Sequence, residues 1–205
     1  MIKTNGCLFV ISAPSGTGKT SLVKALLQLN PDLALSISHT TRPPRPGEID
    51  GRDYHFVTTA TFQQMLLNGE FIESAEVYGN LYGTSQQWVN KVISSGQDIL
   101  LEIDCQGAQQ IRRIFPESVG IFIIPPSSQA LVTRLKARAQ DNPEIIQKRL
   151  AAAREEISHV AEYDYVIVND VLEHALSDLV SIVKAEHLKK SRQLINHSEL
   201  IRQFS

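Results

Sequence analysis

The sequence predicts an α/β fold, in which a mostly parallel β-sheet is covered by helices on both faces. The main observation is that short apolar runs, typical of buried strands, alternate with amphipathic helical patterns. The strand-like runs span residues 7–13, 98–104, 119–125 and 165–168. The later helical patterns span residues 108–114, 128–140, 144–162 and 173–192. A glycine-rich turn joining the first strand to the first helix is the second observation, and it points to the same fold class.

The composition restricts the class of protein. A chain of 205 residues with 42% apolar content suits one globular domain with small insertions. The formal net charge of −2 predicts no large basic surface for nucleic acid, so any anion site must be local. Cys7 and Cys105 stand far apart without metal-ligand spacing, which is typical of a reducing cytoplasm. No apolar run approaches the roughly 18 residues of a membrane span, and we expect no membrane association.

The elements follow from local patterns. "CLFVISA" is short and rich in β-formers, and it leads directly into a motif, so it predicts a strand rather than a signal peptide. In the helix that follows, Leu22, Ala25, Leu26 and Leu29 recur at helical spacing. "DILLEID", "VGIFIIP" and "YVIV" predict three further buried strands. Residues 35–90 interrupt this alternation and predict a small α+β insertion that ends near a helix at 85–95.

The stretch "APSGTGKT" has the composition of a phosphate-binding loop (P-loop) between a strand and a helix. Gly18, Lys19 and Thr20 match the pattern, whereas Ala13 stands where the first glycine is expected. Backbone N–H groups of such a loop bind phosphate, the lysine approaches the β- and γ-phosphates, and the threonine hydroxyl helps to hold Mg²⁺. We therefore assign a nucleoside triphosphate to the whole loop, which consists of Ala13, Pro14, Ser15, Gly16, Thr17, Gly18, Lys19 and Thr20.

A P-loop leaves the phosphate acceptor open: water or a second substrate. The chain lacks the Asn-Lys-x-Asp signature of guanine-specific GTPases, and the segment 38–54, "SHTTRPPRPGEIDGRDY", favours a second substrate. Its prolines stiffen a loop that carries Arg42 and Arg45. Guanidinium groups form the planar fork that binds phosphate, and Tyr54 and Tyr82 add hydroxyl groups. A stiff, solvated basic loop without a ligand is the structural alternative.

Three further residues are suited to a purine base. Glu73 follows two apolar residues, and a carboxylate accepts two parallel N–H bonds, which match guanine N1–H and the 2-amino group. Adenine presents a bare acceptor at N1 and does not match. Ser38 and Thr84 carry hydroxyls that could donate to guanine O6. Each residue alone is commonly just solvated, but their joint occurrence after a P-loop favours a guanine nucleotide.

Several longer segments together resemble the guanylate kinases, the enzymes that transfer phosphate from ATP to GMP. The matching segments are "SAPSGTGKTS", "SHTTRPPRPGEIDGRDYHFV", "FIESAEVYGNLYGTS", "DILLEIDCQGAQQIR", "IFIIPPS" and "EYDYVIVND". The resemblance implies a P-loop nucleoside monophosphate kinase fold, with a parallel-sheet core, a small α+β GMP-binding insertion and a helical lid. The implied ranges are a kinase-like domain at 5–184, an insertion at 35–95, a lid at 127–155 and a C-terminal helical extension at 185–205.

The resemblance also implies residue roles, with ATP as donor, Mg²⁺ as cofactor and GMP or dGMP as acceptor. The residues implied to bind the acceptor are Ser38, Arg42, Arg45, Tyr54, Glu73, Tyr82, Thr84, Glu102 and Asp104. Those implied to act in catalysis are Lys19, Arg42, Arg138 and Arg149. In addition, Arg134 and Asn169 are implied on the ATP side, with Asn169 facing adenine.

The chain departs from the family pattern at two places. Many relatives have Asp-Ile-Asp where this chain has Glu102-Ile103-Asp104, so the first carboxylate reaches about one methylene further. The lid reads "KARAQ" in place of Arg-Gly-Arg-Gly, which keeps Arg138 but should stiffen its helix.

Two other functions remain open on the sequence. One is a catalytically inactive, guanylate kinase-like protein-interaction module, against which Lys19, Thr20, Arg138 and Arg149 argue. The other is a P-loop kinase for a different nucleoside monophosphate, which depends on Glu73. Homo-oligomer formation is left open.

Overall fold

The computed structural model describes residues 6–137 and 143–204. Among these residues, five strands form a core sheet in the order β2–β7–β1–β8–β9, and every neighbouring pair is parallel. The strands are β1 (Leu8–Ser12), β2 (Ala34–Leu35), β7 (Ile99–Glu102), β8 (Val119–Ile124) and β9 (Tyr165–Val168). The predicted α/β class with a parallel core is confirmed. The two-residue strand β2, which extends the sheet beyond β7, was not predicted.

Helices cover both faces of this sheet because side chains alternate along each strand. From β1, Phe9 and Ile11 pack into a cluster with α1 (Lys19–Leu29) and α7 (Leu172–His187). Leu8 and Val10 point to the other face and pack with α3 (Gln86–Ser94) and α4 (Cys105–Ile114). The continuous apolar run of β1 is thus explained by burial on two sides.

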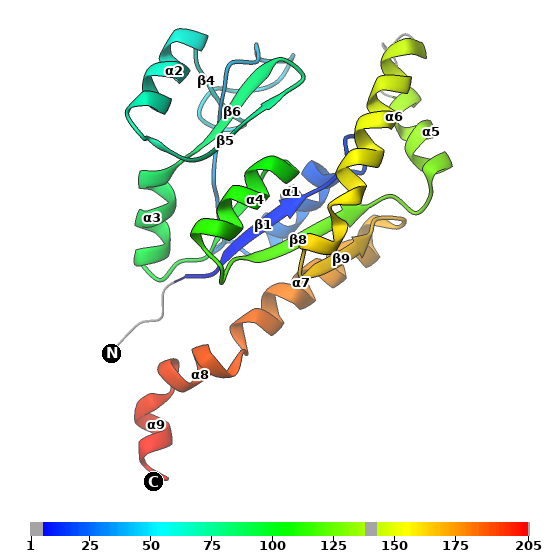
Figure 1. The fold of residues 1–205 in the computed structure, drawn as a ribbon. Helices are drawn as coiled ribbons and strands as arrows, with labels where there is room; N and C mark the ends of the chain where they lie inside the picture. The colour runs from blue at the N-terminus through cyan, green and yellow to red at the C-terminus, as the bar shows by residue number, and fades with distance from the viewer. Residues whose placement is uncertain (1–5, 138–142, 205) are drawn as a thin grey trace.

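The insertion forms a second sheet, in the order β4–β3–β6–β5, which lies at one end of the core (Figure 1). Its elements are β3 (His39–Thr40), β4 (His55–Phe56), α2 (Thr59–Leu67), β5 (Phe71–Val77) and β6 (Asn80–Ser85). The strands β5 and β6 form an antiparallel hairpin that turns at Tyr78 and Gly79, both with positive φ. The expected α+β character of this region is therefore present.

The region predicted to be a lid contains α5 (Ser128–Ala137) and α6 (Pro143–Ser158), which pack on each other through a small apolar cluster. Because α6 begins at Pro143, Arg149 lies inside this helix. The predicted helix 144–162 is too long. The Ser158 hydroxyl donates to the Glu155 carbonyl where α6 ends, and a 3-10 turn (Val160–Glu162) follows.

The C-terminal helix is interrupted where a single helix over 173–192 was predicted. α7 ends at His187, and Lys189 has an extended backbone before α8 (Lys190–Asn196) begins. With α9 (Ser198–Arg202), α8 points away from the core sheet (Figure 1). None of the helices in the described part of the chain has the length and apolar character needed to cross a membrane.

Candidate active site

The phosphate loop joins β1 to α1 in a conformation that requires glycine. Gly16 and Gly18 have φ values of 91° and 93°, in the left-handed region that L side chains rarely adopt. A Cβ atom on Gly18 would also lie 2.6 Å from Asn169 Nδ2. Within the loop, the Thr17 N–H and hydroxyl both donate to the Pro14 carbonyl, at 3.2 and 2.8 Å. The loop is therefore tightly turned, and it ends on the N-terminus of α1, which favours anions.

Arg134 and Asn169, two residues predicted to bind ATP, form hydrogen bonds with the backbone of this loop. Arg134 Nη1 and Asn169 Nδ2 both donate to the Thr17 carbonyl, at 3.3 and 2.6 Å. Arg134 Nη2 also donates to the Asn169 carbonyl at 2.9 Å, which ties α5 to the end of β9. The Asn169 side chain is buried against the loop, so its expected contact with adenine stays a prediction.

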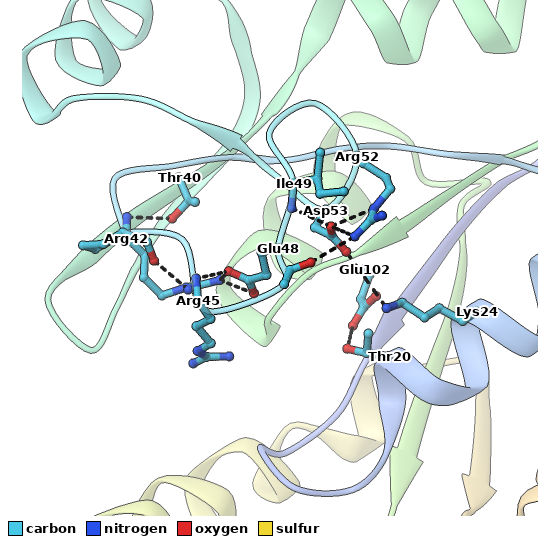
Figure 2. A network of polar contacts seen from close by, with 12 residues as sticks. Thr20, Lys24, Thr40, Arg42, Arg45, Glu48, Ile49, Arg52, Asp53 and Glu102 are labelled. Carbon is cyan, nitrogen blue, oxygen red and sulfur yellow. Dashed lines mark hydrogen bonds and ion pairs between the residues drawn. The ribbon is translucent and has the colours of Figure 1, made fainter.

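Oxygen atoms suited to Mg²⁺ lie beside the loop. The Thr20 hydroxyl donates to Glu102 Oε1 at 2.6 Å (Figure 2). Lys19 Nζ lies 3.8 Å from the same carboxylate oxygen. Lys19 Nζ also donates to the Ile103 carbonyl at 3.3 Å. Hydroxyl and carboxylate oxygens are the ligands that Mg²⁺ prefers, so Thr20 and Glu102 fit the ion. The Asp104 side chain caps α4 by accepting from the Gly107 N–H at 3.0 Å.

The arginine- and proline-rich loop is organised by Glu48, a residue that the sequence analysis missed. Both oxygens of Glu48 accept from Arg42 Nη2, at 2.8 and 2.9 Å, and Oε2 also accepts from the Arg45 N–H at 2.7 Å. Burial opposes the charge of Glu48, but these hydrogen bonds outweigh it and hold its pKa below the usual value. In Figure 2 the Arg45 side chain points away from Glu48.

Aromatic rings flank Arg42, and a second ion pair stiffens the loop. The Arg42 guanidinium carbon lies 5.3 Å from the centre of the Tyr54 ring, which is itself 6.0 Å from the Tyr82 ring. Burial raises the pKa of Tyr54 to about 12, so its hydroxyl remains a neutral donor. Arg52 forms an ion pair with Asp53 at 2.7 Å (Figure 2), so its guanidinium group stabilises the loop.

Glu73 and Thr84 face each other across the β5–β6 hairpin. The Thr84 hydroxyl donates to Glu73 Oε1 at 2.5 Å, and the two residues are 0% and 3% exposed, respectively. Burial raises the pKa of Glu73 to about 7, and the negative charge of Asp104 acts in the same direction. A Cβ atom on Gly107 would lie only 2.4 Å from Glu73 Oε2, so the absent side chain at this position of α4 makes room for the carboxylate.

These groups meet in one cleft of about 250 Å³ between the core and the insertion. Its predicted lining residues are Ala13, Pro14, Ser15, Gly16, Thr17, Gly18, Lys19, Thr20, Ser38, Arg42, Arg45, Tyr54, Glu73, Tyr82, Glu102 and Asp104. Thr84 stands behind Glu73, and Arg149 is not among the described residues that line the cleft. Arg138 lies outside the described residues. Tyr78 and Glu156 also line the cleft, although sequence reasoning gave neither a role.

A second cluster of polar groups lies at the opposite end of β1. Ligand atoms of Cys7, Asp98 and His187 lie within 4.8 Å of one another. Asp98 accepts from the Cys7 N–H at 2.6 Å and pairs with His187 Nε2. Burial raises the pKa of Cys7 to about 12, which keeps the thiol protonated at neutral pH. The cluster is therefore a structural connection between β1, β7 and α7.

Comparisons with known proteins agree on one family. The family model described as guanylate kinase matches residues 5–186. The guanylate kinase of Nitrosospira multiformis is 60% identical over 205 residues, covering 100% of this chain and 98% of the relative. That of Nitrosomonas europaea is 59% identical over 199 residues, covering 97% of this chain and 99% of the relative.

A solved structure supports the same assignment. The crystal structure of guanylate kinase from Anaplasma phagocytophilum superposes with a TM-score of 0.80 at 37% identity, covering 94% of this chain and 92% of that chain. The chain therefore belongs to the guanylate kinase family, the nucleoside monophosphate kinases that transfer the γ-phosphate of ATP to GMP.

Proposed function

We propose that the cleft performs this transfer with ATP on the P-loop and GMP against the insertion. The observation that carries the proposal is that the phosphate loop, the Arg42 loop and the buried Glu73 carboxylate line a single cleft. An ATP-binding loop and a guanine-matched carboxylate in one cleft suit direct transfer between two nucleotides. The insertion at 35–95 would then bind GMP, and the lid at 127–155 would close over ATP.

On the donor side, the loop N–H groups and Lys19 would bind the phosphates of ATP. The Arg134 and Asn169 contacts to the Thr17 carbonyl support this role indirectly, because they fix the backbone of the loop. Thr20 and Glu102 would hold Mg²⁺, whose positive charge offsets that of the β- and γ-phosphate oxygens when it is bound.

On the acceptor side, Arg42, Arg45, Tyr54 and Tyr82 would bind the GMP phosphate. Glu48 supports this arrangement, because it fixes the Arg42 guanidinium and the backbone at Arg45 before any ligand arrives. Such preorganisation lowers the entropy lost on binding. Asp104 would lie near the base and the metal.

Glu73 would read the base. Its ionised carboxylate would accept from guanine N1–H and the 2-amino group. The Ser38 hydroxyl belongs to a residue that lines the same cleft, and the Thr84 hydroxyl donates to Glu73. The residues assigned to the acceptor would contact its phosphate and its base, and none is assigned to the ribose 2′ position. We therefore propose that dGMP is accepted as well as GMP.

The transfer step would depend on positioning and charge. The acceptor is a phosphate oxygen that is already nucleophilic, so no general base is needed. Arg138 and Arg149 would stabilise the charge of the transferring phosphoryl group, a contribution of about 10³–10⁵ in rate in related enzymes. Lid closure would also exclude water as a competing acceptor.

A coupled ADP-release assay with GMP, dGMP, IMP, AMP, CMP and UMP tests the proposal. We expect GMP and dGMP to be used efficiently and ATP alone to release ADP very slowly. Preference for another monophosphate would refute the Glu73 assignment, and no transfer to any of the six would favour an interaction module.

Two further proposals concern the surroundings of the enzyme. Cys7 and Cys105 are both free thiols, and we propose that the protein works in the reducing cytoplasm.

The extension after α7 exposes several large apolar side chains, and we propose that it contributes to self-association. These side chains are Leu188, Leu194, Ile195, Leu200, Ile201 and Phe204.

A further inference from the structure

Glu156 is a lid-helix residue that reaches the phosphate loop. It lies in the last turn of α6 and lines the cleft together with Ser15 and Lys19. The Cys105 thiol points to the Glu156 carbonyl at 3.8 Å, which connects this turn of α6 to the first turn of α4. The side chain is therefore held at the point where the lid helix, the phosphate loop and α4 meet.

The Glu156 carboxylate is an incompletely satisfied anion. It accepts a hydrogen bond from the backbone N–H of Ser15, in the phosphate loop. Its Oε2 atom is buried and has no hydrogen-bond partner within the described ranges 6–137 and 143–204. Burial raises the pKa of Glu156 to about 7, which Lys19 opposes and Asp104 reinforces. A neutral amide could make the same hydrogen bond without the cost of burying a charge.

We propose that Glu156 acts as a placeholder for the γ-phosphate of ATP: its carboxylate accepts the Ser15 N–H from which a γ-phosphate oxygen accepts once the donor binds. This inference rests on the proposed assignment of the loop to ATP. Loop N–H groups bind anions in general, and a carboxylate meets the same donors as a phosphate oxygen. Two anions cannot share one N–H group and the Lys19 charge without repulsion, so ATP must displace Glu156.

Displacement of the Glu156 carboxylate would also affect Arg149, which lies on the same helix. Arg149 and Glu156 are seven residues apart on α6, which places them on the same side of the helix. The charges of both residues influence the pKa of Tyr78, at the tip of the β5–β6 hairpin, so this side of α6 is turned toward the hairpin. When ATP displaces the carboxylate, the last turn of α6 loses its contact with the loop, and the helix that carries Arg149 becomes free to reorient.

The test compares ATP and ADP binding to wild type and Glu156→Gln, by titration calorimetry with Mg²⁺ and without GMP. The amide keeps the size and an acceptor but removes the competing charge. We expect ATP to bind about tenfold more tightly, the difference between a charged and a neutral hydrogen bond. ADP, which has no γ-phosphate, should gain clearly less. The matched control is Glu155→Gln, the exposed neighbour, which should change neither affinity.

A second variant keeps the test decisive if the amide disturbs folding, which a thermal melt reports. Glu156→Ala removes the acceptor altogether and should also favour ATP over ADP. Unchanged or weaker ATP binding in both folded variants, or an equal gain for ADP, would show that Glu156 only supports the loop and would overturn the proposal. These titrations contain no acceptor, so they test the role of Glu156 separately from the proposed function. The proposed function would be refuted by a different result, namely that wild type does not phosphorylate GMP.

Discussion

Substitution of Glu73 by Gln is the sharpest test of how the site recognises its acceptor. Glu73 is 3% exposed, and its Oε1 atom accepts the Thr84 hydroxyl at 2.5 Å. In the variant, the amide oxygen keeps that hydroxyl, so the amide nitrogen takes the place of Oε2. One acceptor for guanine is thereby replaced by a donor, which leaves a guanine N–H group without its partner.

The expected magnitude follows from one charge-assisted hydrogen bond. Such a bond contributes about 1.5–3 kcal/mol, so kcat/KM for GMP should fall about 10- to 100-fold. IMP lacks the 2-amino group and should lose less, whereas the N1 lone pair of AMP can now accept from the amide. Wild type should rank GMP above IMP and IMP above AMP, and the variant should compress this order.

The raised pKa of Glu73 adds a pH signature. Below pH 7 the protonated carboxyl offers one acceptor fewer, so the GMP KM of wild type should fall as pH rises from 6 to 8. Glu73→Gln should lack this component, while protonation of the GMP phosphate affects both proteins equally. Stability should change in the opposite sense: the folded pKa lies above the unfolded value of 4.5, so wild type loses stability as pH rises through about 7. The variant should lack this contribution and keep only that of Glu156, whose pKa is raised in the same way.

Steady-state kinetics by coupled ADP release, with GMP, IMP and AMP at several pH values, measure these effects. Glu76→Gln is a matched control on the same strand, because its side chain is exposed, and it should behave as wild type. If Glu73→Gln used GMP as efficiently as wild type, or if wild type preferred AMP, the recognition argument would have to be abandoned.

Four other substitutions test three separate parts of the site. Lys19→Ala should lower kcat at least about 10²-fold with an unchanged circular dichroism spectrum, and retention of a tenth of wild-type kcat would contradict its role. Arg42→Lys and Arg45→Lys lose the planar fork and should raise the GMP KM while ATP binding, measured by calorimetry, stays constant; an unchanged GMP KM in both would return this loop to a purely structural role. Gly107→Ala places a methyl group 2.4 Å from the Glu73 carboxylate, so kcat/KM for GMP should fall while the ATP dissociation constant does not change, and full GMP activity would argue against the close packing.

The α/β class and the conformation of the glycine-rich loop follow from local sequence. The β1 run is apolar on both faces, and the glycines after it are the residues that tolerate φ near +90°. These preferences act within a few residues, which is why a strand, a tight anion-binding turn and a helix could be predicted without any tertiary contact. The chemical types of Arg42 and Glu73 likewise predicted a nucleotide acceptor before their positions were known.

Tertiary structure decided the contacts between distant segments and the ends of several elements. Gly107 matters because α4 packs against β5 and brings it to Glu73, and Glu156 matters because the end of α6 reaches the phosphate loop. Glu48 lies only six residues after Arg42, yet its role depends on how the loop folds back. The short strand β2 exists because β7 offers it a partner. None of these contacts produces a recognisable local sequence pattern. Each forms only when the chain folds and brings the two segments into contact.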